Sequence, residues 1–220
     1  MLCKDYISNQ LHILHKTNTV HDALALKLQC GVPFFAVEED NKFLGIVALD
    51  DLQQLDEEKQ LQEVEDEFIK ISVKETDHIL TALKLMQSFK VDVIAVTNSS
   101  QDFLGEISQD SIIDAVSKYL SVNEGRFGLI ALEVLPLHYS ITELTKLVQA
   151  NDAEIMQLNT YLDHETGNLI ISIMVNKTEL SALVATFQRY EYHVRYYFGE
   201  ENYDNKLQAN YDLLMKYINL

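Results

Sequence analysis

The sequence predicts a mixed α/β protein in which one small unit occurs twice and a third α/β unit follows. Two stretches sixty positions apart share a pattern, FLGIVALDD at residues 43–51 and FLGEISQDS at residues 103–111. Short apolar strand patterns alternate with amphipathic helix patterns around both stretches. The second half shows strand and helix patterns in the order βαββαβ, which is typical of a ferredoxin-like split unit.

The first copy opens with an extended piece at residues 12–14 and then a helix. Thr19 and Asp22 have the spacing of a capping box, so the helix is expected to start there. Two strands are predicted at residues 33–37 and 43–48, because both runs are apolar and bounded by polar turns. A second helix is expected after an acidic cap at Asp50 or Asp51.

The second copy repeats this order. An extended piece at residues 68–73 precedes a helix whose apolar stripe consists of Ile79, Ala82, Leu83 and Met86. When Gly45 is aligned with Gly105, the strand at 33–37 falls on a strand at 93–97, and a second strand covers 103–108. A helix follows Asp110 or Ser111.

This doubled unit of helix, strand, strand and helix resembles a tandem pair of cystathionine-β-synthase (CBS) domains, the Bateman module, over about residues 5–120. We place the first CBS repeat at 1–60 and the second at 61–122. One such unit cannot cover its own sheet face, so the two are expected to pack about a pseudo-twofold axis. The charged stretch between them, residues 53–67, is interpreted as a solvated helix extension and linker, with an acidic docking surface as the alternative.

The resemblance implies a site for an adenosyl ligand built on a Gly-apolar-x-Thr/Ser-x-x-Asp segment. The first copy has the ribose-type carboxylate, Asp51, but Ala48 stands where the hydroxyl belongs. The second copy has the hydroxyl, Ser108, at a helix N-terminus that favours phosphate, but Ser111 replaces the carboxylate. Asp110 would serve if the turn shifts by one residue. A helix N-cap role accounts for Asp51 and Ser108 without any ligand.

In the family the adenine lies between apolar strand residues, which the resemblance places here at Pro33, Phe34 and Ile94. The candidate ligands are an adenine nucleotide, such as AMP or ATP, and S-adenosylmethionine. The chain has three Arg residues, none before Arg126, so phosphate in the first half would depend on Lys, hydroxyls or backbone N–H groups. An adenosyl ligand with little charge is therefore favoured over ATP, and an empty, purely structural pair is the alternative.

In the second half, strands are predicted at 128–135, 153–162, 169–175 and 192–198. Ser140 and Glu143 form a capping-box pattern before one helix, and Asn176 is expected to cap the other. Gly167 suits the hairpin turn at 163–168, because glycine adopts positive φ.

This order resembles an ACT domain, a regulatory fold that binds amino acids in many enzymes, and we place it at residues 126–200. The first strand-to-helix turn, residues 135–139, lacks the Gly that lets backbone N–H groups approach an amino-acid carboxylate. Edge-to-edge pairing with a second copy therefore suits the residues better than amino-acid binding. His138 with Tyr139 is a candidate small-molecule contact, or else a surface turn.

A C-terminal helix is expected at 201–220, because apolar residues recur there at alternating spacings of four and three: Leu207, Tyr211, Leu214 and Ile218. Such an apolar stripe is expected to pack either against its own domain or in a dimer interface.

The formal net charge of −17 excludes a nucleic-acid partner and argues against an anionic membrane surface. Cys3 and Cys30 match neither a zinc pattern nor a disulfide framework, which is typical of a cytoplasmic, bacterial-style protein. No common catalytic motif occurs. His12 and His15 would point to opposite faces of a strand, so no metal site is expected.

The sequence therefore predicts a non-catalytic regulatory protein that works as a homodimer. In this hypothesis an adenosyl ligand shifts the CBS pair between arrangements, and the ACT-like domain passes the change to a regulated protein partner. The alternative is a structural dimerisation or assembly module whose ligand sites have degenerated.

Overall fold

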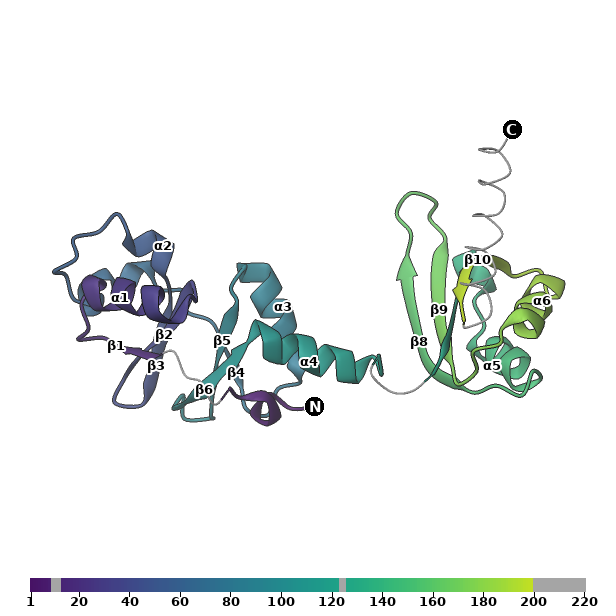
Figure 1. The fold of residues 1–220 in the computed structure, drawn as a ribbon, viewed down its shortest axis with the longest axis horizontal. Helices are drawn as coiled ribbons and strands as arrows, with labels where there is room; N and C mark the ends of the chain where they lie inside the picture. The colour runs from purple at the N-terminus through teal and green to yellow at the C-terminus, as the bar shows by residue number, and fades with distance from the viewer. Residues whose placement is uncertain (9–12, 123–125, 200–220) are drawn as a thin grey trace, which may run out of the picture. The chain divides into compact units, whose positions relative to one another are not determined.

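The computed structural model describes residues 1–8, 13–122 and 126–199, and it divides the chain into two compact units, Met1–Val122 and Asn123–Leu220 (Figure 1). The expected C-terminal helix at 201–220 lies outside the described residues, as does His12.

The first unit contains two three-stranded sheets, each with its own helices. The first sheet has the order β1-β2-β3, in which β1 is parallel to β2 and β2 is antiparallel to β3. Its elements are β1 (Ile13–His15), α1 (Val20–Cys30), β2 (Phe34–Glu39), β3 (Lys42–Ala48), α2 (Leu49–Leu52) and the 3-10 helix η2 (Leu61–Glu67).

The second sheet, β4-β5-β6, has the same strand directions. Its elements are β4 (Ser72–Lys74), α3 (Ile79–Phe89), β5 (Val93–Thr97), β6 (Phe103–Ser108) and α4 (Gln109–Tyr119), while the 3-10 helix η1 (Cys3–Tyr6) precedes both sheets. The predicted duplication of helix, strand, strand and helix is therefore present in the structure.

The strand registers show that the two copies do not match at a constant distance in sequence. Phe34 pairs with Ala48, and Val93 pairs with Ser108, so Phe34 and Val93 are equivalent residues. The copies are therefore offset by 59 positions (93 minus 34) before the β2–β3 turn and by 60 (108 minus 48) after it. The expected alignment of residues 33–37 with 93–97 is wrong by one residue, because the first copy has one residue fewer in that turn.

Equivalent residues meet where the two copies contact each other. Lys42 and Asp102, sixty positions apart, form a salt bridge, and the Phe43 and Phe103 rings stack with centroids 6.1 Å apart. Ala36 and Ala95, also equivalent by register, are buried together with Phe103. This pairing of like with like is what an approximate twofold axis between the copies requires.

The segment before each copy packs on the other copy. Cys3 N–H donates to Asp77 O (2.8 Å) and Ser8 N–H donates to Glu106 O (2.8 Å), so residues 1–8 belong with the second sheet. Ile46 and Ile69 exchange backbone hydrogen bonds of 2.9 and 2.8 Å, and Phe68 is buried in the core of the first copy. The exchange ties the two copies into one unit. It also buries Cys3, which raises the pKa of its thiol to about 11.

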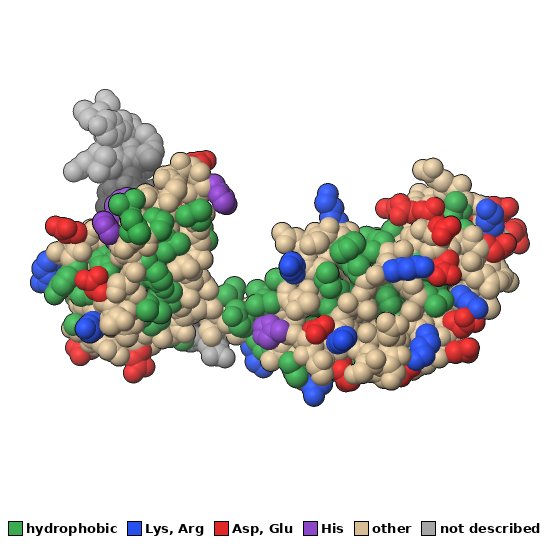
Figure 2. Space-filling view, turned by 180° about the vertical axis from the view of Figure 1, so that it is seen from behind, with side chains coloured by type: hydrophobic (Ala, Val, Ile, Leu, Met, Phe, Trp, Pro, Cys, Tyr) green, Lys and Arg blue, Asp and Glu red, His purple; other side chains and the backbone are tan. Residues whose placement is uncertain are grey.

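The charged stretch at 53–67 is not a solvated helix extension. α2 ends at Leu52, and η2 follows with Leu61 and Val64 buried against the first sheet. The acidic side chains of this stretch remain on the surface, and Figure 2 shows Asp and Glu gathered over the end of the unit that carries α1 and α2.

The second unit is a four-stranded antiparallel sheet with the order β10-β7-β9-β8. α5 and α6 cover one of its faces (Figure 1), and their buried side chains form a core with the strands. The elements are β7 (Gly128–Val134), the 3-10 helix η3 (Pro136–His138), α5 (Ile141–Gln149), β8 (Ile155–Leu162), β9 (Leu169–Val175), α6 (Ser181–Arg189) and β10 (His193–Phe198). The predicted βαββαβ order is confirmed.

The helix caps match the sequence expectations unevenly. Thr19 and Asp22 form the full capping box at α1, with Thr19 Oγ1 accepting from Asp22 N–H (3.1 Å) and Asp22 accepting from Thr19 N–H (2.9 Å). Asn176 does not cap α6, because its side chain accepts instead from Glu154 N–H (2.8 Å) and Leu180 occupies the N-cap position. Gly167 adopts φ 71° in the hairpin turn, as expected.

Candidate functional site

The first unit contains a cleft of about 220 Å³ between the two copies. The starts of β2 and β5 line it together with the end of β6 and the first turn of α4. Its residues are Val32, Pro33, Phe34, Asp92, Val93, Glu106, Ser108, Gln109 and Asp110. Segments about sixty positions apart thus form one cavity.

Equivalent backbone contacts hold the two strand starts in place. Leu49 N–H donates to Pro33 O (2.9 Å), and Gln109 N–H donates to Asp92 O (2.8 Å). Pro33 and Asp92 are equivalent by register, so each copy uses the same hydrogen bond to fix the start of its inner strand beside the helix that follows.

Ser108 is the N-cap of α4. Its Oγ accepts from Ser111 N–H at 3.3 Å and lies 3.1 Å from Ser111 Oγ. The hydroxyl therefore satisfies one of the N–H groups that a helix start leaves without partners. The equivalent residue, Ala48, offers no such bond to α2, and Asp50 and Asp51 follow it in the first turn instead of capping the helix.

Carboxylates dominate the charge of the cleft. Asp92, Glu106 and Asp110 line it, and none of the nine described lining residues is Lys or Arg. Glu106 is buried at 1% exposure, and its backbone carbonyl accepts a hydrogen bond from Ser8 N–H (2.8 Å) in the N-terminal segment. A negatively charged phosphate chain would meet repulsion here, whereas a neutral or cationic group would not.

The structure brings four of the six predicted ligand residues into the cleft, namely Pro33, Phe34, Ser108 and Asp110. Asp51 is exposed on α2, and Ile94 is fully buried in the core of the second copy. The sequence reasoning missed the other five lining residues: Val32, Asp92, Val93, Glu106 and Gln109. Val93 is the true equivalent of Phe34, so an alignment with a one-residue gap in the β2–β3 turn would have found it and left Ile94 out.

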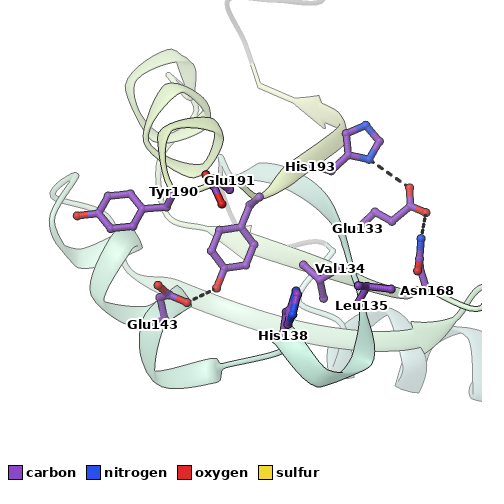
Figure 3. A pocket seen from close by; sticks show the side chains of 10 residues that line it. Glu133, Val134, Leu135, His138, Glu143, Asn168, Tyr190, Glu191 and His193 are labelled. Atoms are coloured by element: carbon purple, nitrogen blue, oxygen red, sulfur yellow. Dashed lines mark hydrogen bonds and ion pairs between the residues drawn. The ribbon is translucent and has the colours of Figure 1, made fainter.

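The second unit has a larger open cavity of about 550 Å³. It lies beside the turn between β7 and α5, where the sequence had singled out His138 (Figure 3). The lining residues are Glu133, Val134, Leu135, His138, Glu143, Asn168, Tyr190, Glu191, Tyr192 and His193. Tyr139 does not line it and instead packs against the core.

Glu143 shows why only half of the predicted capping box forms at α5. Ser140 Oγ accepts from Glu143 N–H (3.3 Å), as the pattern predicts. The Glu143 carboxylate accepts a hydrogen bond from the Tyr192 hydroxyl (2.7 Å), and no return bond to the Ser140 backbone is described. Burial and the nearby Glu143 both raise the pKa of Tyr192, so this hydroxyl stays a donor.

No group of three His, Cys, Asp or Glu side chains suited to a metal ion occurs among the described residues. Within the same residues, no helix combines the length and apolarity needed to cross a membrane.

Residues 66–118 match the CBS domain family. A search of the curated proteins found no match. Among solved structures, a CBS domain pair/ACT domain protein from Thermotoga maritima superimposes with a TM-score of 0.50 and 22% identity, covering 55% of this chain and 99% of the other.

Two further structures resemble the chain with lower scores. The acetoin utilization protein AcuB, as it is named, from Vibrio cholerae is 23% identical with a TM-score of 0.47 over 56% of this chain and 96% of its own. CBSX2 in complex with AMP is 19% identical with a TM-score of 0.44, over 54% and 98%. The family match and the Thermotoga structure confirm the predicted resemblance: the fold is a CBS domain pair followed by an ACT-like domain.

Proposed function

We propose that the chain is a non-catalytic regulatory protein whose CBS pair binds an adenosyl ligand of little negative charge. The observation that carries this proposal is the cleft itself, in which Pro33, Phe34, Ser108 and Asp110 come together from both copies. Apolar strand residues on one side and a helix start on the other suit a flat ring joined to a polar sugar.

The charge and size of the cleft favour an adenosine-like or S-adenosylmethionine-like ligand over ATP. Its volume of about 220 Å³ lies below the usual range for drug-sized ligands, and its ionisable lining consists of Asp92, Glu106 and Asp110. A triphosphate would bring several negative charges toward these carboxylates without a Lys or Arg among the described lining residues. AMP is intermediate between these ligands in negative charge.

In this proposal the ligand acts by a population shift. Both copies contribute residues to the cleft, so a ligand that contacts both favours one arrangement of the pair over another. The ACT-like domain then passes this change of arrangement to a regulated protein partner. In this proposal the protein works as a homodimer.

An assembly module is the second candidate. Ser108 already has a structural role at α4, and Asp51 lies outside the cleft. In addition, α3 and α4 expose large apolar side chains, Leu80, Leu83, Phe89, Ile113 and Tyr119, which suit an interface with a second copy.

A thermal-shift titration of the full chain tests the proposal, with adenosine, AMP, ATP and S-adenosylmethionine as probes. A ligand that binds only the folded state adds about 2.7 kcal/mol of stability at a hundredfold excess over Kd. We expect adenosine or S-adenosylmethionine to raise the Tm more than ATP does. If ATP raises it most, the argument from charge is wrong.

Two matched variants locate the binding. Asp110→Asn is expected to change the rise in Tm that the ligand produces. Asp50→Asn makes the same change at the equivalent exposed position of the first copy, and it is expected to leave the rise in Tm intact. A flat response to all four probes, together with a stable dimer by light scattering, favours the assembly module.

A further inference from the structure

The cavity of the ACT-like domain has a lining unlike that of an amino-acid site. Three of its ten lining residues are Glu133, Glu143 and Glu191, and none of the ten is Lys or Arg. Figure 3 shows Glu143 and Glu133 on opposite sides of the cavity, with His138 between them. A ligand entering here meets a carboxylate on either side.

Neighbouring groups hold both of these carboxylates in place. Glu143 accepts from the Tyr192 hydroxyl at 2.7 Å. Glu133 accepts from Asn168 Nδ2 at 2.8 Å and lies 3.3 Å from His193 Nδ1. The Asn168 bond, with Arg195 and His193 nearby, keeps the pKa of Glu133 below its usual value, so the carboxylate stays charged at neutral pH.

Arg195 offsets this charge only in part. Its Nε lies 3.5 Å from Glu133, but its Nη1 lies 2.9 Å from Asp163, so two carboxylates share one guanidinium. Arg195 is also not among the residues that line the cavity.

The turn beside the cavity has few donors to offer an anion. Pro136 has no N–H, and the N–H groups of His138 and Tyr139 donate to Leu135 O (2.8 Å) and Pro136 O (3.4 Å). The carboxylate of an amino acid would therefore face the glutamates with only Arg195 and His193, both already beside Glu133, and without a cluster of free N–H groups to balance it.

Aromatic rings complete a lining that suits positive charge. Tyr192 is buried, and Phe187 fixes its ring edge-on at 5.8 Å, while Tyr190 is half exposed at the rim. Ammonium groups bind both carboxylates and the faces of aromatic rings. We infer that this cavity, of about 550 Å³, binds a small organic cation that carries an ammonium group and no carboxylate.

Isothermal titration of the full chain with choline and with putrescine tests this inference. Leucine and succinate serve as a zwitterion and an anion of similar size. We expect saturable binding of at least one cation, and weak or undetectable binding of leucine and succinate. The inference is overturned if neither cation binds, or if leucine binds more tightly than both.

Variants then test the location. Glu143→Gln and Glu133→Gln each remove one charge that faces the cavity, and each should weaken cation binding by about tenfold or more. Glu165→Gln makes the same change on the exposed hairpin turn and should leave binding unchanged. Tyr190→Ala at the rim is a second test that spares the core, with an expected loss of several-fold. If Glu165→Gln and Glu143→Gln weaken cation binding equally, the net charge of the protein is responsible and the proposed site is wrong.

Discussion

The two CBS repeats have the same strand order and directions but differ at the helix that follows the second strand. In the second copy, α4 runs for 11 residues from a serine N-cap, whereas in the first copy α2 has four residues and an alanine at the same position. The cleft lies beside the capped helix. The comparison teaches that the sheet registers tolerate divergence less than the helix starts do, because every residue of a paired strand must keep its face.

The short length of α2 also explains the path of the chain between the two copies. Because α2 ends at Leu52, the chain that follows turns back and buries Leu61, Val64 and Phe68 against the first copy. In the second copy, the core is completed by residues 1–8 instead. Each copy therefore depends on a segment that the sequence assigns to the other side of its boundary.

The largest expected effect comes from the matched core pair Phe35 and Ile94, which are equivalent by register and almost fully buried. Phe35→Ala and Ile94→Ala should each lower the free energy of unfolding by about 3 kcal/mol or more. Urea denaturation measures both. A loss below about 1 kcal/mol for Ile94→Ala would show that the residue is not part of the core and would reopen its role as a ligand contact.

Gly45 should be the next most sensitive position. A Cβ built there lies 2.6 Å from Phe68 Cβ, so Gly45→Ala forces Phe68 away from the first sheet. We expect a cost of about 1–3 kcal/mol, as for other overpacked cores. In the double variant Gly45→Ala with Phe68→Gly, which removes the Phe68 Cβ, the two losses should be less than additive. Strict additivity would contradict the proposed contact.

Exchanging the cap residues between the copies tests the comparison directly. Ser108→Ala should cost about 1 kcal/mol, because α4 loses the side chain that accepts from Ser111 N–H. Ala48→Ser should add up to about 1 kcal/mol by supplying that acceptor to α2. Thermal unfolding followed by circular dichroism gives both values. A destabilising Ala48→Ser would mean that α2 is short for a reason other than its missing cap.

The smallest effect is expected at the salt bridge between Lys42 and Asp102, both partly exposed. The hydrogen bond from Lys42 keeps the pKa of Asp102 below its usual value. Its contribution to stability is therefore present above the ordinary pKa of an aspartate and is lost as the pH falls through the lowered value. In urea titrations, Lys42→Met should shift the unfolding midpoint slightly at pH 7 and less at pH 2. The same shift at both pH values would rule out an electrostatic role.

Much of the fold followed from the sequence alone. The strands at 93–97, 103–108 and 169–175 have the predicted bounds, because their apolar runs end at polar turns that stop a strand wherever it is placed. The capping box of Thr19 and Asp22 was also predicted correctly, because both residues lie within one helical turn and their hydrogen bonds need no other part of the fold.

Contacts between distant segments were decided only in the tertiary structure. Glu143 matched a capping box, but Tyr192, far along the chain, placed a hydroxyl 2.7 Å from its carboxylate. Val93 and not Ile94 faces the cleft, because a shift of one residue in a strand reverses the side chain and the β2–β3 turn sets that shift. Local patterns determine which elements form, since their hydrogen bonds close within a few residues. Which side chains share a cavity depends on registers and on the exchange of segments between copies, which only the packed chain fixes.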